Sequence, residues 1–279
     1  PDHDGIISLS PDGRSIAFSK KTNSSIGWFG DPIDGGYQLL IASRTATGEW
    51  SEARPFPFVE KGYVFAHPTW SPEGNRLYFA TDLPSPEAQG GMDIWVSERN
   101  GTFWEEPLNL GPEVNSAGDD VFPAFDSNGR LYFASNGHPT LGGLDIFWTE
   151  IDPTVKPEAR HWRDGDVWKT PVRMAFPINS LADDYAFAIE PDGTHGFICS
   201  NREGFDEVFR VEHNEDVTAF NVVVTDYATG EALPRVPIRW IDLKDGSAWD
   251  NRTSLDGTLS IDLPPNRGFH VVCALPGYL

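Results

Sequence analysis

One pattern recurs four times along this chain, and it restricts the possible folds more than any other feature. A turn of the Pro-Asp-Gly type stands at residues 11–13, 72–74, 127–129 and 191–193, at spacings of 61, 55 and 64 residues. Each turn is followed by an apolar run, a glycine-containing loop and a second apolar run. In the first three copies a tryptophan follows, with a proline a few residues later. Such self-similarity is typical of repeat architectures, so the sequence predicts one structural unit per copy.

Each copy is expected to form four short antiparallel strands, separated by the turn, the glycine loop and a further connection. Both faces of these strands carry apolar residues, as in the third copy, where Leu144, Ile146 and Trp148 alternate with Asp145 and Phe147. A sheet that is apolar on both faces must be packed on both faces, and radially stacked sheets satisfy this requirement. The sequence therefore predicts an all-β chain with a β-propeller of about four blades. These blades are either part of a larger ring or a closed four-bladed ring.

The pattern changes near residue 216, which predicts a second domain. Residues 1–215 form the expected propeller. Residues 216–279 alternate apolar and polar positions between turns, which is typical of a small β-sandwich with one face of each strand buried. Both ends of the chain are expected to have been cut, so that the sandwich is truncated at its C-terminus.

Composition excludes several classes of function. Forty-two acidic and twenty-one basic residues give a net charge of −21, which repels phosphate backbones and argues against nucleic-acid partners. No run approaches the roughly 20 apolar residues that a membrane-spanning helix needs. Cys199 and Cys273 match no metal or redox spacing and are expected to be small buried hydrophobes.

Recurring acids are the main candidates for a repeated site. One aspartate recurs inside an apolar strand, where a carboxylate needs hydrogen bonds, and we interpret it as structural. Two acidic pairs enter the innermost strands from one shared face of the disc, at the channel mouth. They either cap turns and accept hydrogen bonds from loop amides, or contribute oxygen ligands to a cation site. Calcium is the candidate ion for such a site. No metal or cofactor is otherwise predicted. The structural residues are Asp93, Asp145 and Asp206, and the channel-mouth candidates are Asp119, Asp120, Asp183 and Asp184.

Two insertions that the other copies lack are candidate partner-binding segments. One is a long glycine-rich loop in the first copy, and the other is a basic and aromatic cluster in the third. Exposed aromatic and arginine side chains are typical anchors of protein interfaces, although these aromatics could instead fold back onto their own blades. The candidates are Trp28, Phe29, Arg160, Trp162 and Arg163.

Signatures of catalysis are missing from the sequence. It contains no G-x-S-x-G, H-E-x-x-H, P-loop or C-x-x-C pattern. The module after the propeller is too small to be a hydrolase domain. The sequence therefore predicts that this chain is not an enzyme and has no catalytic residues.

The repeats resemble TolB-type propellers, whose blades carry the same Ser-Pro-Asp-Gly turn followed by a run such as LYFAS. More narrowly, AHPTWSPEGNRLYFATD, GGMDIWVSE and PLNLGPEVNSAGDDVFPAF are similar to the propeller of OmpA-family envelope proteins of Bacteroidetes. The tail, with VTDYATGEALPRVPI and SLDGTLSIDLPP, resembles the carboxypeptidase-regulatory-like domain that follows that propeller. The resemblance covers nearly the whole chain.

This resemblance implies a six-bladed ring and a periplasmic, outer-membrane-associated scaffold, in some relatives part of the type IX secretion or gliding machinery. Its implied partners are other envelope or secretion-system proteins, and peptidoglycan would be contacted only through a domain that is not in this chain. The alternative is a propeller that binds carbohydrate or peptidoglycan fragments at the channel mouth. The first copy departs from the pattern, because GGYQLL lacks the aspartate of its sister copies. This departure weakens any site that would run around the whole ring.

Overall fold

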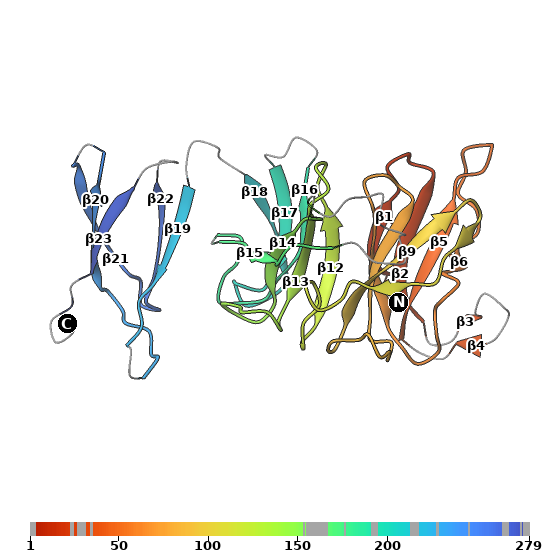
Figure 1. Cartoon of the computed structure of the whole chain (residues 1–279), viewed down its shortest axis with the longest axis horizontal. Coiled ribbons are helices and arrows are strands. Elements are labelled where there is room, and N and C mark those ends of the chain that lie inside the picture. Colours follow the sequence, from red (N-terminus) through yellow and green to blue (C-terminus); the bar gives the residue numbers. More distant parts are fainter. Residues whose placement is uncertain are drawn as a thin grey trace. The chain divides into compact units, whose positions relative to one another are not determined.

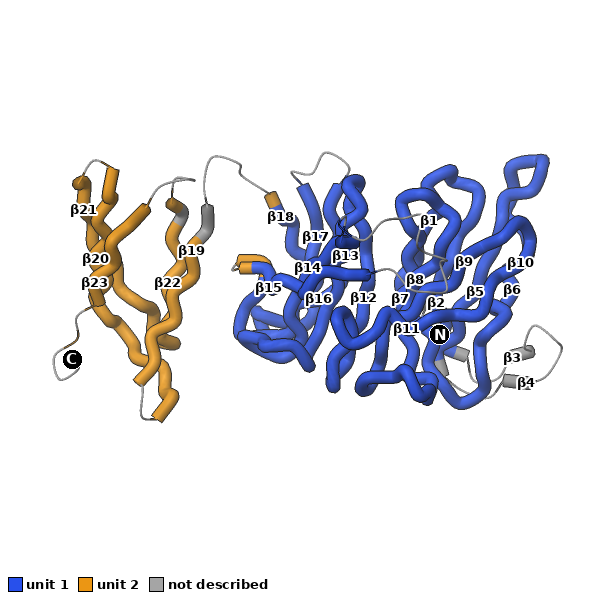
Figure 2. The backbone as a smooth tube through the Cα atoms, viewed as in Figure 1, with its two compact units in different colours: residues 1–174, 179–211 blue, residues 175–178, 212–279 orange. Residues whose placement is uncertain are grey.

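The chain divides into two compact units in the computed structural model. It describes residues 4–22, 25–26, 32–33, 36–152, 154, 167–175, 177–190, 195–212, 218–226, 229–244, 246–263, 268–273 and 275. Unit 1 comprises residues 1–174 and 179–211, and unit 2 comprises residues 175–178 and 212–279 (Figure 2). Every regular element among the described residues is a β-strand (Figure 1). The predicted all-β class is therefore confirmed.

Unit 1 contains four antiparallel sheets, one for each copy of the repeat. In each, the chain runs up and down from an innermost strand, and in the first three sheets the Pro-Asp-Gly-type turn joins the first two strands. The first sheet has the order β1-β2-β5-β6 and the second β7-β8-β9-β10, with β11 also paired to β9. The third has the order β12-β13-β14-β15, and the fourth β16-β17-β18. Strands β3 and β4 form a separate ribbon.

The strand bounds follow the repeat. In the first copy they are β1 (Asp4–Leu9), β2 (Ser15–Thr22), β3 (Ser25–Ile26), β4 (Pro32–Ile33), β5 (Gly36–Ser43) and β6 (Arg54–Pro55). In the second they are β7 (Phe65–Trp70), β8 (Arg76–Thr81), β9 (Asp93–Asn100), β10 (Phe103–Trp104) and β11 (Leu108–Asn109). In the third they are β12 (Asp120–Phe125), β13 (Leu131–Ser135), β14 (Asp145–Thr149) and β15 (Val172–Arg173). In the fourth they are β16 (Asp184–Ile189), β17 (His195–Ser200) and β18 (Glu207–Glu212).

Alternate residues of the second sheet enter two different cores, as expected of a propeller blade. Leu77, Phe79 and Trp95 pack toward the first sheet, against Ala17 and Leu39. The residues between them in the strands, Tyr78, Ile94 and Val96, pack toward the third sheet, against Leu131, Phe133 and Phe147. This packing of both faces confirms the propeller fold of unit 1.

Each innermost strand contains a β-bulge. The strand pairing shifts between Ala66 and Thr69 in β7, at the equivalent position in β12 and β16, and one residue earlier in β1. Three non-glycine residues at this position adopt positive φ: His67 (53°), Phe122 (55°) and Ala186 (52°). Such a backbone conformation costs on the order of 1–3 kcal/mol per residue, so the surrounding sheet must impose it.

Unit 2 is a small β-sandwich with its own core. Its two sheets have the orders β19-β22 and β21-β20-β23. Ile238 and Trp240 of one sheet pack against Leu263 of the other, and all three are almost fully buried. The strands are β19 (Thr218–Val223), β20 (Pro237–Asp242), β21 (Ala248–Arg252), β22 (Thr258–Leu263) and β23 (Phe269–Cys273).

Candidate functional site

The acidic pairs at the predicted channel mouth belong to a hydrogen-bonded motif that joins neighbouring sheets. We name the motif, Asn-Ser-x-x-Asp-Asp, the latch. It occurs at residues 115–120, before the third sheet, and again at residues 179–184, before the fourth. Each latch runs along the edge of the third strand of the preceding sheet. The two acids therefore belong to one structural motif with the asparagine and serine that precede them.

The asparagine of the latch bonds to both backbone groups of one residue. Asn115 Oδ1 accepts from Ile94 N at 2.8 Å, and Asn115 Nδ2 donates to Ile94 O at 3.0 Å. Asn179 repeats the pattern on Ile146, at 2.6 and 2.9 Å. Both asparagines are buried. The side-chain amide thus continues the pairing of β11 with β9 and of β15 with β14.

The first aspartate of each latch bonds to the backbone two residues further along, toward the N-terminus. Asp119 Oδ1 accepts from Met92 N, and Asp183 Oδ1 accepts from Leu144 N, both at 2.9 Å. Their own backbone N–H groups donate to Asn136 Oδ1 and Asn201 Oδ1, at 2.7 and 2.9 Å. Each carboxylate therefore fixes a loop of its own sheet against the preceding one.

The second aspartate is fully buried and closes the latch on itself. Asp120 Oδ2 accepts from Ser116 N at 2.5 Å and from Ser116 Oγ at 2.9 Å, and Asp184 does the same with Ser180. Arg202 Nη2 additionally donates to Asp184 Oδ1 at 2.5 Å. Burial raises the pKa of the Asp120 carboxyl. All four channel-mouth candidates are thus engaged in backbone or side-chain hydrogen bonds between and within the sheets.

The recurring strand aspartates have two different environments. Asp93 Oδ2 accepts from Gln89 N at 2.7 Å and from Asn109 Nδ2 at 2.8 Å, and Asp145 Oδ2 accepts from Leu141 N at 2.7 Å. Both are buried, and burial raises the pKa of Asp145. Asp206, at the same position of the fourth copy, is exposed. Burial of the Tyr185 hydroxyl and then the Asp206 carboxylate raise the pKa of Tyr185.

The glycine pair before each strand aspartate is explained by the latch. A Cβ on Gly91 would meet Asp119 Oδ1 at 2.3 Å, and one on Gly143 would meet Asp183 Oδ1 at 2.0 Å. Only a residue without a side chain lets the aspartate carboxylate of the latch approach this closely. The glycines therefore recur because a larger residue here would keep the neighbouring sheets apart.

The interface between the first and second sheets has no latch. The corresponding segment, residues 56–65, contains no Asn, Ser or Asp, and Val64-Phe65 stand in place of the acidic pair. Gln38 replaces the strand aspartate; it is 1% exposed, and neither its Nε2 nor its Oε1 has a hydrogen-bond partner in the described structure. The first interface thus lacks both the latch and the buried strand aspartate that the second and third interfaces contain.

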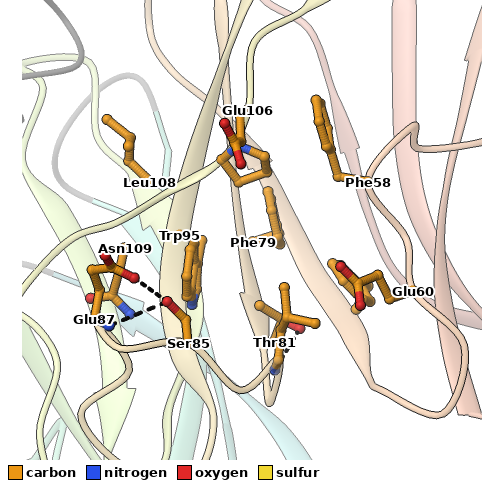
Figure 3. Close-up of a pocket in the computed structure, with 13 residues that line it drawn as sticks. Phe58, Glu60, Phe79, Thr81, Ser85, Glu87, Trp95, Glu106, Leu108 and Asn109 are labelled. Carbon is orange, nitrogen blue, oxygen red and sulfur yellow. Dashed lines mark hydrogen bonds between the residues drawn. The ribbon is translucent and has the colours of Figure 1, made fainter.

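A hollow of about 500 Å³ opens at this first interface, and we name it the glutamate hollow (Figure 3). Its walls come from the segment that replaces the latch, from one face of the second sheet and from two loops of that sheet. Aromatic side chains form its inner surface, and glutamates stand around it (Figure 3). The lining residues are Phe58, Glu60, Phe65, Phe79, Thr81, Leu83, Ser85, Glu87, Trp95, Glu106, Pro107, Leu108 and Asn109.

The equivalent space at the second interface is filled. Phe133 and Phe147 correspond to Phe79 and Trp95, and the ring of His138 lies against both, with centroids 5.9 and 5.1 Å apart. His138 Nε2 lies 2.8 Å from Val114 O, which anchors the ring in place. The loop of the second sheet has Pro84 instead of this histidine. The hollow therefore exists because one copy lacks both the latch and the histidine.

A second cluster lies on the innermost strands. His67 stacks on Phe122 at a centroid distance of 3.7 Å, and Phe122 lies 5.1 Å from Tyr185. Burial lowers the pKa of His67 to about 4, so its imidazole is neutral at neutral pH. The sequence predicted no link between these residues. His67 and Phe122 are both the third residue of their innermost strands, which was the available signal, whereas Tyr185 is the second residue of β16.

The candidate partner-binding residues Trp28, Phe29, Arg160, Trp162 and Arg163 lie outside the described residues, and their role stays a prediction. Within the described part of the chain, no group of three or more His, Cys, Asp or Glu side chains is arranged to hold a metal ion. The same residues include no helix long and apolar enough to cross a membrane.

Comparison with known proteins shows similarity of fold only. No protein-family model matches the chain, and no curated protein matches it by sequence. A puromycin hydrolase structure matches 90% of this chain at 18% identity, with a TM-score of 0.42. A puromycin-hydrolysing peptidase of Mycobacterium tuberculosis matches 90% at 11% identity, TM-score 0.38. A putative TolB from Agrobacterium tumefaciens matches 94% at 13% identity, TM-score 0.37.

These structures correct one expectation. The prediction that the chain is not an enzyme is wrong as stated, because propellers of this kind occur within peptidases. The chain spans 33% of the length of the puromycin hydrolase and 90% of that of the putative TolB. At these identities the likeness concerns the fold alone, and it assigns no peptidase activity to this chain.

Proposed function

We propose that this chain is a protein-binding scaffold module of the bacterial envelope, periplasmic and associated with the outer membrane. On this proposal it serves the type IX secretion or gliding machinery and binds other proteins of that machinery. The TolB-like propeller fold supports the general assignment. The resemblance of the blade motifs and of the tail to OmpA-family envelope proteins supports the narrower one.

The observation that carries the proposal is the contrast within the propeller. Two interfaces are joined by latches whose polar groups bond to each other and to the neighbouring sheet. The first interface, which has no latch, leaves the glutamate hollow with its aromatic walls. Preorganised concave surfaces with aromatic side chains are typical binding sites, and a rigid frame lowers the entropy that binding removes.

The test is recovery of partners from the native envelope. The full-length protein, tagged and cross-linked in living cells, should recover a reproducible set of envelope or secretion-system proteins. The control is the same protein with the latch asparagines replaced, which should lose those partners together with the fold. Recovery of soluble glycans without any envelope protein would contradict the proposal.

A further inference from the structure

The rim of the glutamate hollow has the charge expected of a cation-binding site. Glu60, Glu87 and Glu106 all line it and are exposed, and no Lys, Arg or His is among its described lining residues. Ser85 Oγ donates to the Glu87 carboxylate, and this bond lowers the pKa of Glu87. The Glu87 carboxylate is therefore ionised throughout the neutral range. A phosphate or carboxylate ligand would be repelled by such a rim.

The inner surface of the hollow suits the stem of a long cationic side chain. Phe79 and Trp95 are 0% and 6% exposed, and Phe58, half-buried, packs against the same hydrophobic cluster (Figure 3). Lysine and arginine place apolar stems along such surfaces while their charged ends reach polar groups. Aromatic rings also attract these cations through their electron-rich faces.

The buried indole N–H of Trp95 gives a second observation that is independent of the acidic rim. Trp95 Nε1 has no hydrogen-bond partner among the described residues, although the side chain lines the hollow. The corresponding position in the next sheet is Phe147, which has no polar atom and is covered by His138. An N–H donor without a described partner thus belongs to the wall of the glutamate hollow, and it suits a backbone carbonyl of a bound segment, because a lysine or arginine head carries donors only.

We propose that the glutamate hollow binds a lysine or arginine side chain from an extended segment of a protein partner. The proposal rests on the proposed scaffold function and names the chemistry of the partner. Charge complementarity selects this occupant, because the rim carries three carboxylates and the chain as a whole carries −21. The volume of about 500 Å³ lies within the range of sites that hold a small ligand or a side chain with its neighbours.

The experiment uses short peptides and the whole chain. Acetyl-Phe-Lys-Phe-amide and acetyl-Phe-Arg-Phe-amide are titrated into the ¹⁵N-labelled protein, and acetyl-Phe-Gln-Phe-amide is the matched neutral probe. The readout is the indole N–H resonance of Trp95, assigned by its loss in W95F. The two cationic peptides should shift it in a saturable manner, and the neutral peptide should bind at least fivefold more weakly.

A charge-matched pair of variants tests the rim. E60Q/E87Q/E106Q should weaken binding of the lysine peptide by about fivefold or more, whereas E49Q/E113Q/E190Q, which removes the same charge elsewhere, should leave it unchanged. Equal binding of all three peptides, or no response of Trp95, would overturn the proposal. So would a shift of Trp95 by chitotriose with no response to the cationic peptides, which would make the hollow a sugar site.

Failure of this inference is distinguishable from failure of the scaffold function. If the wild-type chain and the rim variant recover the same envelope proteins, the scaffold function stands and the hollow is not its docking site. If neither recovers any envelope protein, the scaffold function fails, and the peptide titration still decides the chemistry of the hollow.

Discussion

The first and second interfaces of the propeller solve the same packing problem differently. At the second, Asn115 and Asp119 occupy the edge of β9, and His138 fills the space above Phe133 and Phe147. At the first, Phe65 replaces the buried aspartate, and an open hollow remains. The difference shows that the latch is not required by every blade. A copy that loses it keeps its strands and gains a cavity.

The largest expected effect comes from breaking a latch at its asparagine. N115A removes the acceptor of Ile94 N and leaves a buried N–H without a partner, while Leu110 N still bonds to Ile94 O at 3.1 Å. We expect a loss of about 3 kcal/mol in the free energy of unfolding of unit 1. Urea denaturation followed by tryptophan fluorescence measures it.

The control for that variant is N128A, in an exposed turn where only the backbone N–H of Asn128 is bonded. Its effect should stay within about 0.5 kcal/mol. If N115A were equally mild, the latch would be a consequence of the packing of the sheets and would not hold them together.

A somewhat smaller loss is expected from G91A, which places a methyl group against the latch. The new Cβ would meet Asp119 Oδ1 at 2.3 Å, so the latch must move, at about 2 kcal/mol. D119A removes the same oxygen, so the double variant should be less destabilised than the sum of the single ones. Additive losses would show that the strain at Gly91 comes from another contact.

The sheets of unit 1 could be predicted from the sequence, whereas the hollow could not, and the reasons for this difference are physical. The periodic turns and the two apolar faces of strands such as β14 are local signals, and they required stacked sheets. The structural role of Asp93 and Asp145 also follows from a charge placed inside an apolar strand. Asp206 occupies the same position of the repeat, but its side chain is exposed because no described segment covers it.

The latch was visible only in part. The sequence predicted a role for the acids of NSAGDD and NSLADD, but none for the asparagines that make the paired bonds to Ile94 and Ile146. Their recurrence five residues before the buried aspartate was the usable signal. The hollow arises because the first interface lacks both the latch and the histidine, and the effect of such absences is apparent only once the neighbouring sheets are in place.

The inner strands offer a pH-dependent test of the second interface. Burial lowers the pKa of His67 to about 4 from an ordinary value of 6.5. Between these values the unfolded chain binds a proton that the folded chain does not, so stability falls as the pH drops from about 6.5 to 4. We expect a loss on the order of 2 kcal/mol over this window, discounted for the partial exposure of His67.

H67F keeps an aromatic ring against Phe122 and removes the titrating group. Urea midpoints measured from pH 7 to pH 4 should therefore fall less steeply for H67F than for the wild-type chain. Identical slopes would show that the imidazole is protonated without penalty and is not buried against Phe122 in solution.

The smallest effect, and the only expected gain, concerns the strand position at which the two kinds of interface differ. Gln38 has two buried polar atoms without partners in the described structure. Methionine is similar in shape and needs no hydrogen bonds, so Q38M should stabilise unit 1 by about 1 kcal/mol. D93M, at the equivalent position of a latched interface, should instead destabilise unit 1 by about 2–3 kcal/mol, because Gln89 N and Asn109 Nδ2 lose their acceptor.

Opposite signs of the stability change at Gln38 and Asp93 would show that the first interface does not depend on a polar group at this position of the repeat. A loss in Q38M comparable to that in D93M would mean that Gln38 is hydrogen-bonded in solution, through water or a bound ligand, and that the first interface is closed by a polar contact of its own.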